Sequence, residues 1–173
     1  MILIIVSLMM SVLLMGCKSR GTDKVYNDNN EISKEYDTFG IDRRKETIED
    51  GVYKGNLKIS GTNTIWQYKS DKNFNIKVSG VLSVKGGKGK IVFISPDNKV
   101  INIAEIKDKE VKEYNISVTV PIKKGLNRIK VVGYDKADVN MEIHIDEGKF
   151  QKIKFGSAKN IKENERLRNS IWC

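Results

Sequence analysis

Hydrophobic and polar residues alternate with a period of two over most of residues 52–155. The alternation is clearest at 74–79, 115–120 and 139–146, where every second residue is aliphatic or aromatic. Successive side chains of a β-strand point to opposite faces, so this pattern predicts strands with one buried and one solvated face. Residues 90–94 read Lys-Ile-Val-Phe-Ile and are apolar on both faces, which predicts a central strand.

Turn-forming residues separate these runs. Residues 86–89, Gly-Gly-Lys-Gly, predict a hairpin loop, and residues 95–98, Ser-Pro-Asp-Asn, predict a β-turn with proline at its second position. Further turns are expected at 123–125 and 135–138. About eight or nine strands, spaced about ten residues apart, predict an all-β domain over 51–155, an antiparallel β-sandwich of the jelly-roll or Ig-like type.

The segments on either side of this domain lack a regular period. In residues 17–50, Val25 and Ile32 are scattered among polar side chains, and such a segment buries too little apolar surface to offset its ordering entropy. We therefore predict a flexible polar linker, with a local helix over 43–49 as the alternative. Residues 156–173 form a charged tail that is either irregular or contains a short C-terminal helix.

The chain begins with an uncharged stretch that ends at Cys17. Its apolar core, residues 2–15, is too short to span a membrane and has the length of a signal-peptide core. Residues 14–17, Leu-Met-Gly-Cys, resemble the lipobox of bacterial lipoproteins, in which a peptidase cuts before the cysteine. The resemblance implies a signal peptide over 1–16, cleavage between Gly16 and Cys17, and lipidation of Cys17. A plain secretory signal and an uncleaved helix are the alternatives.

A lipid on Cys17 implies an address on the extracytoplasmic face of the cell membrane, held by a lipid anchor. Cys173 is the second of two cysteines, and with Cys17 lipidated it is expected to stay free or to link two copies of the chain. Residues 87–101 and 125–133 also resemble strand-and-turn segments of small jelly-roll lipoproteins of low-GC Gram-positive bacteria. Most such lipoproteins have no assigned activity, so this resemblance implies a fold and an address only.

Lysine and arginine outnumber aspartate and glutamate by 31 to 22, which gives a formal net charge of +9. On an exported chain this excess favours contact with an anionic wall polymer, a glycan or lipid head groups; the alternative is a basic surface without a partner. The predicted address argues against a nucleic acid partner.

Candidate chemistry is sparse. His144 is the single histidine, and it shares a predicted strand face with Glu142 and Asp146. These three either bind a divalent cation weakly or, as we expect, form a solvated face. The sequence contains no Gly-x-Ser-x-Gly motif, and the glycines at 86–89 lack the spacing of a phosphate-binding loop. We therefore predict no catalytic residues, no metal and no cofactor, and we expect that the protein is not an enzyme.

Trp66 and Tyr68 are the candidate ligand-binding residues. They are two positions apart and hence on one strand face, where exposed rings can stack on sugars; the alternative is that both belong to the core. We predict a membrane-anchored envelope lipoprotein with a non-catalytic binding or structural role. The alternatives are a glycan or wall-polymer module that uses these two rings, an immunity or inhibitor lipoprotein with a protein partner, and an envelope hydrolase with two carboxylates in one cleft.

Overall fold

The computed structural model describes residues 24–107 and 113–153, and the predictions for the signal peptide, for Gly16, Cys17 and Cys173, and for the tail over 156–173 lie outside these residues. In chain order the elements are η2 (Lys24–Asn27), α3 (Asn29–Ser33), β1 (Phe39–Glu49), β2 (Val52–Ser70), β3 (Phe74–Lys85), β4 (Lys88–Ile94), β5 (Val100–Ile106), β6 (Tyr114–Ile122), β7 (Gly125–His144) and β8 (Lys149–Phe150).

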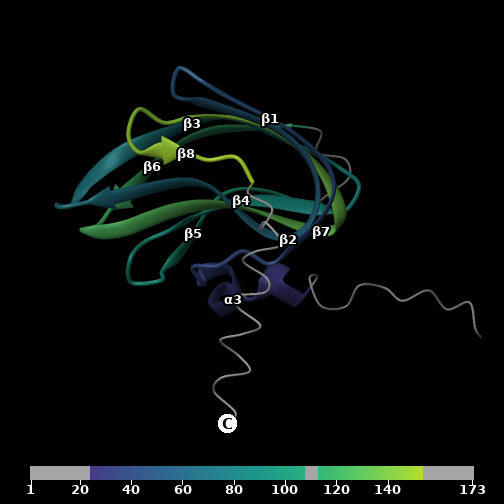
Figure 1. Ribbon diagram of the computed structural model, residues 1–173, viewed down its shortest axis with the longest axis horizontal. Coiled ribbons are helices and arrows are strands. Elements are labelled where there is room, and N and C mark those ends of the chain that lie inside the picture. Colours follow the sequence, from purple (N-terminus) through teal and green to yellow (C-terminus); the bar gives the residue numbers. More distant parts are fainter. Residues whose placement is uncertain (1–23, 108–112, 154–173) are drawn as a thin grey trace, which may run out of the picture.

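The long strands β2 and β7 organise the fold, because each runs through two sheets. In the first sheet, the first half of β2 pairs with the second half of β7, between β1 on one side and β3 followed by β6 on the other. In the second sheet, the remaining halves of β2 and β7 pair with each other, between β8 and β4 followed by β5. The sheets face each other as two layers (Figure 1), which confirms the predicted antiparallel β-sandwich.

Three predicted turns are confirmed. Gly86 and Gly87 join β3 to β4. The backbone N–H of Asn98 donates to the carbonyl oxygen of Ser95 (2.9 Å) and closes the proline-containing turn between β4 and β5. Residues 123–124 join β6 to β7.

The turn predicted at 135–138 is wrong, because these residues lie inside β7. Asp135 and Lys136 both have positive φ angles (54° and 53°), and they form a bulge rather than a chain reversal. The backbone N–H of Lys136 donates to the hydroxyl of Ser60 on β2 (2.8 Å), so the bulge is fixed at its neighbour. This is the point at which β7 passes between the two sheets, a bend that β-bulges commonly provide.

The main core lies between the sheets and consists of the apolar residues of the alternating strands. It includes Ile76, Val78, Ile116, Val120, Val139 and Ile143. The predicted central strand β4 is buried on both faces. Ile91 and Phe93 face the main core, whereas Val92 and Ile94 face a smaller cluster on the outer side of the second sheet.

The smaller cluster corrects the prediction of a flexible linker. Val25, Tyr26 and Ile32 come from residues 24–33 and pack on the outer face of β4 and β7. Figure 1 shows α3 below the layer that contains β4 and β5. Residues 39–49 are strand β1 and not a helix, so the described domain begins at Lys24 rather than at residue 51. The physical reason is that these few apolar residues cover a sheet face that is itself apolar. No helix in the described part of the chain has the length and apolarity to span a membrane.

Candidate functional site

Trp66 and Tyr68, the predicted ligand-binding pair, differ in how deeply the structure buries them. Trp66 is fully buried in the core, and its indole Nε1 donates to the carbonyl oxygen of Glu147 (2.7 Å). Tyr68 is half-buried, with its ring centroid 6.1 Å from that of Trp66. A side chain without exposed surface cannot stack on a ligand, so Trp66 is not half of a stacking platform. Its indole holds the segment that leads into β8.

A depression runs from beside α3 to the edge of the second sheet at β8, and Tyr68 is part of its lining. It consists of three hollows of about 290, 690 and 600 Å³. The hollows adjoin, because Glu35 lines the first and second, Gln67 and Gln151 line the first and third, and Leu126 lines the second and third. We call this combined lining the sheet depression. Its polar side chains include Glu35, Tyr36, Asp37, Asn63, Gln67, Asn98, Arg128 and Gln151.

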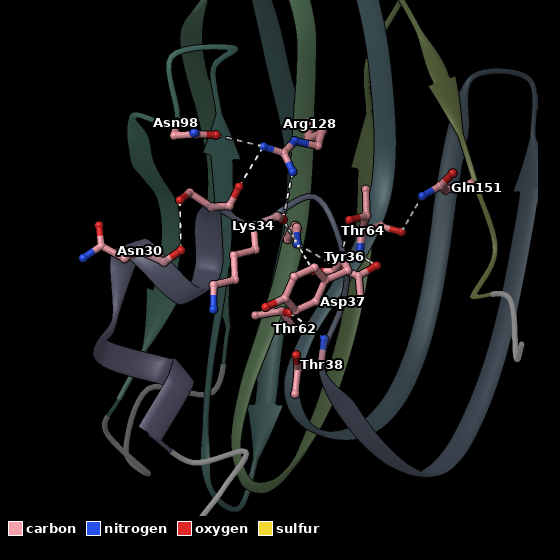
Figure 2. A network of polar contacts seen from close by, with 12 residues as sticks. Asn30, Lys34, Tyr36, Asp37, Thr38, Thr62, Thr64, Asn98, Arg128 and Gln151 are labelled. Atoms are coloured by element: carbon pink, nitrogen blue, oxygen red, sulfur yellow. Dashed lines mark hydrogen bonds and ion pairs between the residues drawn. The ribbon is translucent and has the colours of Figure 1, made fainter. Parts of the chain in front are cut away.

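Two cations of β7, Lys130 and Arg128, hold the wall of the depression in place, and Figure 2 shows Arg128 among its polar contacts. The Lys130 ammonium is fully buried, donates to the carbonyl oxygens of Lys34 (2.7 Å) and Tyr36 (3.0 Å), and pairs with Asp37 Oδ1 at 3.0 Å. The Arg128 guanidinium donates to the carbonyl oxygens of Ser33 and Lys34 at 2.8 Å each. These are the carbonyls that a helix leaves without partners at its end.

Asp37 connects this wall to β2 (Figure 2). Its Oδ2 accepts a hydrogen bond from the backbone N–H of Thr64, and its Oδ1 accepts one from the Thr64 hydroxyl, both at 2.9 Å. Glu35 and Asp37 therefore place two carboxylates in the first hollow, as the hydrolase alternative requires, but both oxygens of Asp37 are engaged by Thr64 and Lys130.

Burial shifts the proton equilibria of both cations. Burial lowers the pKa of Lys130, and the neighbouring Asp37 carboxylate opposes that shift. Burial likewise lowers the pKa of Arg128, against the attraction of Glu35 and Asp37. The acidic side chains of residues 35–37 thus compensate two charges that the fold removes from water.

Two buried donors beside the depression lack partners. Asn63 is only 2% exposed, and neither its Nδ2 nor the Nε of Arg128 has a hydrogen-bond partner within residues 24–107 and 113–153. Both residues contribute to the lining, Asn63 in the first hollow and Arg128 in the second. Buried polar atoms are nearly always paired in native structures, so an unused donor calls for an explanation.

The accessible side chains of the depression carry both donors and acceptors. Gln67 and Gln151 are half-buried amides, and Gln151 Nε2 donates to the carbonyl oxygen of Thr64 (3.1 Å) (Figure 2). Tyr36 stands beside them with 60% of its surface exposed. Amides, a carboxylate and a flat ring can together bind a polar ligand that offers hydroxyl groups on one side and a C–H face on the other.

The face that carries Glu142, His144 and Asp146 is solvated, as predicted. The imidazole Nε2 of His144 lies 2.7 Å from Glu142 Oε1, and Lys54 pairs with the other carboxylate oxygen at 3.0 Å. The hydrogen bond from His144, then that from Lys54, lowers the pKa of Glu142. Within the described ranges no group of three or more His, Cys, Asp or Glu side chains is placed to hold a metal ion.

Sequence reasoning identified Tyr68 but missed Tyr36, Asn63 and Gln151. These three come from the segment after α3, the middle of β2 and the position directly after β8, and none stands in a recognisable motif. The one available signal was the apolar outer face of β4. An apolar face must pack against another segment, and residues 24–33 are the segment that packs there.

Comparison of the sequence with protein-family models and with curated proteins finds no match. Among solved structures, the chain is similar to a carbohydrate-binding module of Cellvibrio mixtus lichenase 5A in complex with cellotriose, at 11% identity over 69% of this chain and 95% of that chain, with a TM-score of 0.39. It is also similar to the exo-β-1,3-galactanase of Phanerochaete chrysosporium with galactose, at 14% identity over 64% of this chain and 27% of that enzyme, with a TM-score of 0.38. A CBM4 structure is similar at 10% identity over 76% of this chain and 97% of that chain, with a TM-score of 0.29. These likenesses assign no family.

Proposed function

We propose that this protein is a non-catalytic glycan-binding module, held at the extracytoplasmic face of the cell membrane by a lipid on Cys17, and that the sheet depression is its binding site. The observation that carries the proposal is the pair of unpartnered buried donors, Asn63 Nδ2 and Arg128 Nε, in the lining of one depression. A fold keeps such donors at a cost in stability, and a ligand site gives a reason to keep them.

The side chains around these donors suit a sugar. Sugar hydroxyls both donate and accept, and the amides of Gln67 and Gln151 offer both functions at adjoining hollows. The exposed ring of Tyr36 lines the first hollow, and the half-buried ring of Tyr68 lines the third. An aromatic ring at each of two hollows that share their amides suits a chain of sugar units rather than a single one.

The depression suits a protein partner less well. The centre of a stable protein interface is apolar and anchored by large side chains. Among residues 24–107 and 113–153, the large hydrophobic side chains that are exposed rather than half-buried are Tyr36 and Tyr114, and of these two Tyr36 lies at the depression. This favours the glycan over the immunity or inhibitor alternative.

Calorimetric titration of the full-length protein in a neutral detergent tests the proposal. The probes are a neutral β-linked oligosaccharide, an N-acetylated oligosaccharide and an oligosaccharide with uronic acid units. We expect at least one to bind, and we expect Tyr36→Ala to weaken that binding by about tenfold, because it removes the exposed stacking ring.

Tyr114→Ala is the matched control, because Tyr114 is the other exposed aromatic residue in the described part of the chain and lies on β6, away from the depression. It should bind like the wild type. Absence of binding to all three probes, or an equal loss in both variants, would contradict the proposal. Release of reducing ends during incubation would contradict its non-catalytic part.

A further inference from the structure

We infer that the protein has a second binding site, a lysine-lined hollow at the end of the sandwich where β3 turns into β4, and that it binds the phosphate groups of a polyol-phosphate polymer. We call it the lysine hollow. It has a volume of about 550 Å³ and shares no lining residue with the sheet depression. The inference does not depend on the proposed function.

The fold gathers these lysines from segments that are far apart in the sequence. Lys58 comes from β2, Lys85 and Lys88 from the two sides of the β3–β4 turn, Lys107 from the residue after β5, and Lys136 from the bulge of β7. All but the half-buried Lys58 are exposed. Because four separate segments contribute, the cluster is a product of tertiary structure and not of one charged run.

The lining has more positive than negative charge. Five lysines and two aspartates, Asp135 and Asp138, line the hollow, so it carries an excess of three positive charges. Asp138 is already paired with Arg43 at 2.6 Å, and Arg43 does not line the hollow. One of the two carboxylates in the lining is therefore neutralised by a cation outside the hollow.

Three of the five lysines form no ion pair with the described residues. Lys107 pairs with Glu105 (3.1 Å) and Lys136 with Asp42 (3.2 Å), and the Lys88 ammonium lies 5.3 Å from the centre of the Tyr134 ring. No carboxylate within residues 24–107 and 113–153 lies within ion-pair distance of Lys58, Lys85 or Lys88. Like charges held together without counter-charges raise one another's energy, and an anionic ligand relieves that repulsion.

The shape and lining select among phosphate-bearing ligands. A membrane-surface site usually adds exposed apolar or aromatic side chains that enter the lipid, and a site for single-stranded nucleic acid adds rings on which bases stack. The one aromatic residue of the lysine hollow, Tyr134, is half-buried and carries Lys88 over its ring. Flexible point charges around a polar hollow suit phosphate groups on a chain without bases, because ammonium groups bind phosphate without fixed geometry.

Calorimetric titration of the full-length protein with a synthetic glycerol-phosphate oligomer of defined length tests the inference. We expect Lys58→Gln/Lys85→Gln to weaken binding by about tenfold or more, since two of the three lysines without an ion pair are lost. Lys77→Gln/Lys124→Gln is the matched control, because it removes the same charge from two exposed lysines outside the hollow. The control should stay within about twofold of the wild type.

The remaining arms identify the source of the phosphate. Vesicles of phosphatidylcholine with and without phosphatidylglycerol are compared, so that any N-terminal anchor contributes equally to both. Equal binding to the two vesicles is expected; a strong preference for phosphatidylglycerol that disappears in Lys58→Gln/Lys85→Gln would overturn the polymer in favour of the lipid surface. No binding of the oligomer, or an equal loss in both double variants, would overturn the site itself. Neither variant should change binding of an oligosaccharide at the depression, so the two proposals fail independently.

Discussion

The ammonium of Lys130, on β7, lies 3.0 Å from Asp37 Oδ1, in the segment between α3 and β1, and has no exposed surface. Since Asp37 also accepts two hydrogen bonds from Thr64, one buried ion pair connects the N-terminal segment to both long strands. The segment that covers the second sheet is therefore fixed by specific polar contacts as well as by apolar packing.

Asp37→Asn is expected to lower the free energy of unfolding by about 3 kcal/mol, because it leaves the buried Lys130 charge without its counter-charge. Urea unfolding measures this change. Asp71→Asn is the control, because Asp71 is an exposed aspartate in the turn between β2 and β3, and it should cost less than about 0.5 kcal/mol. The double variant Asp37→Asn/Lys130→Met should be more stable than Asp37→Asn alone. An unfolding free energy of Asp37→Asn equal to that of the wild type would show that the ion pair between Asp37 and Lys130 does not stabilise the fold.

The strands and most turns could be predicted from the sequence, because alternation and turn residues are local signals. The cover of the second sheet could not, because Val25, Tyr26 and Ile32 belong to a short 3-10 helix, a single helical turn and their flanks, which have no readable period. Val92 and Ile94 showed that the outer face of β4 is apolar, but the sequence of a strand does not identify the segment that packs on that face. Asp28, which lies in the segment predicted to be a flexible linker, is the N-cap of α3.

The candidate site could be predicted only in part, for a related reason. Tyr68 stood out as an aromatic residue on a strand, but the sequence does not show how deeply each ring is buried. Trp66 and Tyr68 both pack on the main core, and Trp66 is fully buried whereas Tyr68, nearer the end of β2, is half-buried. The remaining residues of the sheet depression are polar side chains that look like ordinary surface until the fold brings them together. Residues 135–138 were predicted to be a turn, but Asp135 and Lys136 form a bulge. Positive φ angles occur in bulges as well as in turns, so the same kinds of residue are found in both.

Asn63→Leu is expected to leave the free energy of unfolding unchanged or to raise it, while abolishing the gain in stability that a bound glycan gives. Leucine has a similar size and removes a buried donor that has no partner in the described structure. Thermal unfolding with and without the oligosaccharide measures both quantities. Gln67→Leu, at a half-buried position of the same depression, should lose binding with a small change in stability. A loss of several kcal/mol in Asn63→Leu would mean that its amide is structural.

Gly87→Ala is expected to destabilise the protein far more than Gly86→Ala, although the two residues form one turn. Both have positive φ, so each substitution carries the cost of that conformation, about 1 kcal/mol. A Cβ at Gly86 meets open space, whereas one at Gly87 would lie 2.2 Å from the carbonyl oxygen of Tyr134. Urea unfolding of the two variants side by side isolates the steric part. Equal losses would show that the turn does not pack against the bulge of β7 as described.

Cys17→Ser is expected to move the protein from the membrane fraction to the soluble fraction, because a two-chain lipid anchor holds a protein stably and its removal leaves only weak surface attraction. Cell fractionation followed by detection of the chain measures this. Cys173→Ser removes the other thiol and should stay with the membrane. Retention of Cys17→Ser in the membrane fraction would instead favour an uncleaved N-terminal segment.

Tyr53→Phe is expected to reduce the loss of stability at alkaline pH. Burial, and after it the hydrogen bond to Glu46 Oε1 (2.7 Å), raises the pKa of the Tyr53 phenol above its ordinary value of 10.0, with Arg44 opposing. In the unfolded chain the phenol ionises from about pH 10, so the folded protein binds more protons above that pH and its stability falls as pH rises. The Tyr53 contribution at about pH 11 amounts to about 1.4 kcal/mol, and the fall in unfolding free energy from about pH 9 to about pH 11 should be smaller by that amount in Tyr53→Phe.

Tyr26, whose pKa is also raised by burial and by Glu105, contributes a second fall in the same pH range, and this fall remains in Tyr53→Phe. The exposed Tyr114→Phe should keep the wild-type slope, and a slope in Tyr53→Phe equal to it would show that the Tyr53 phenol is not buried as described.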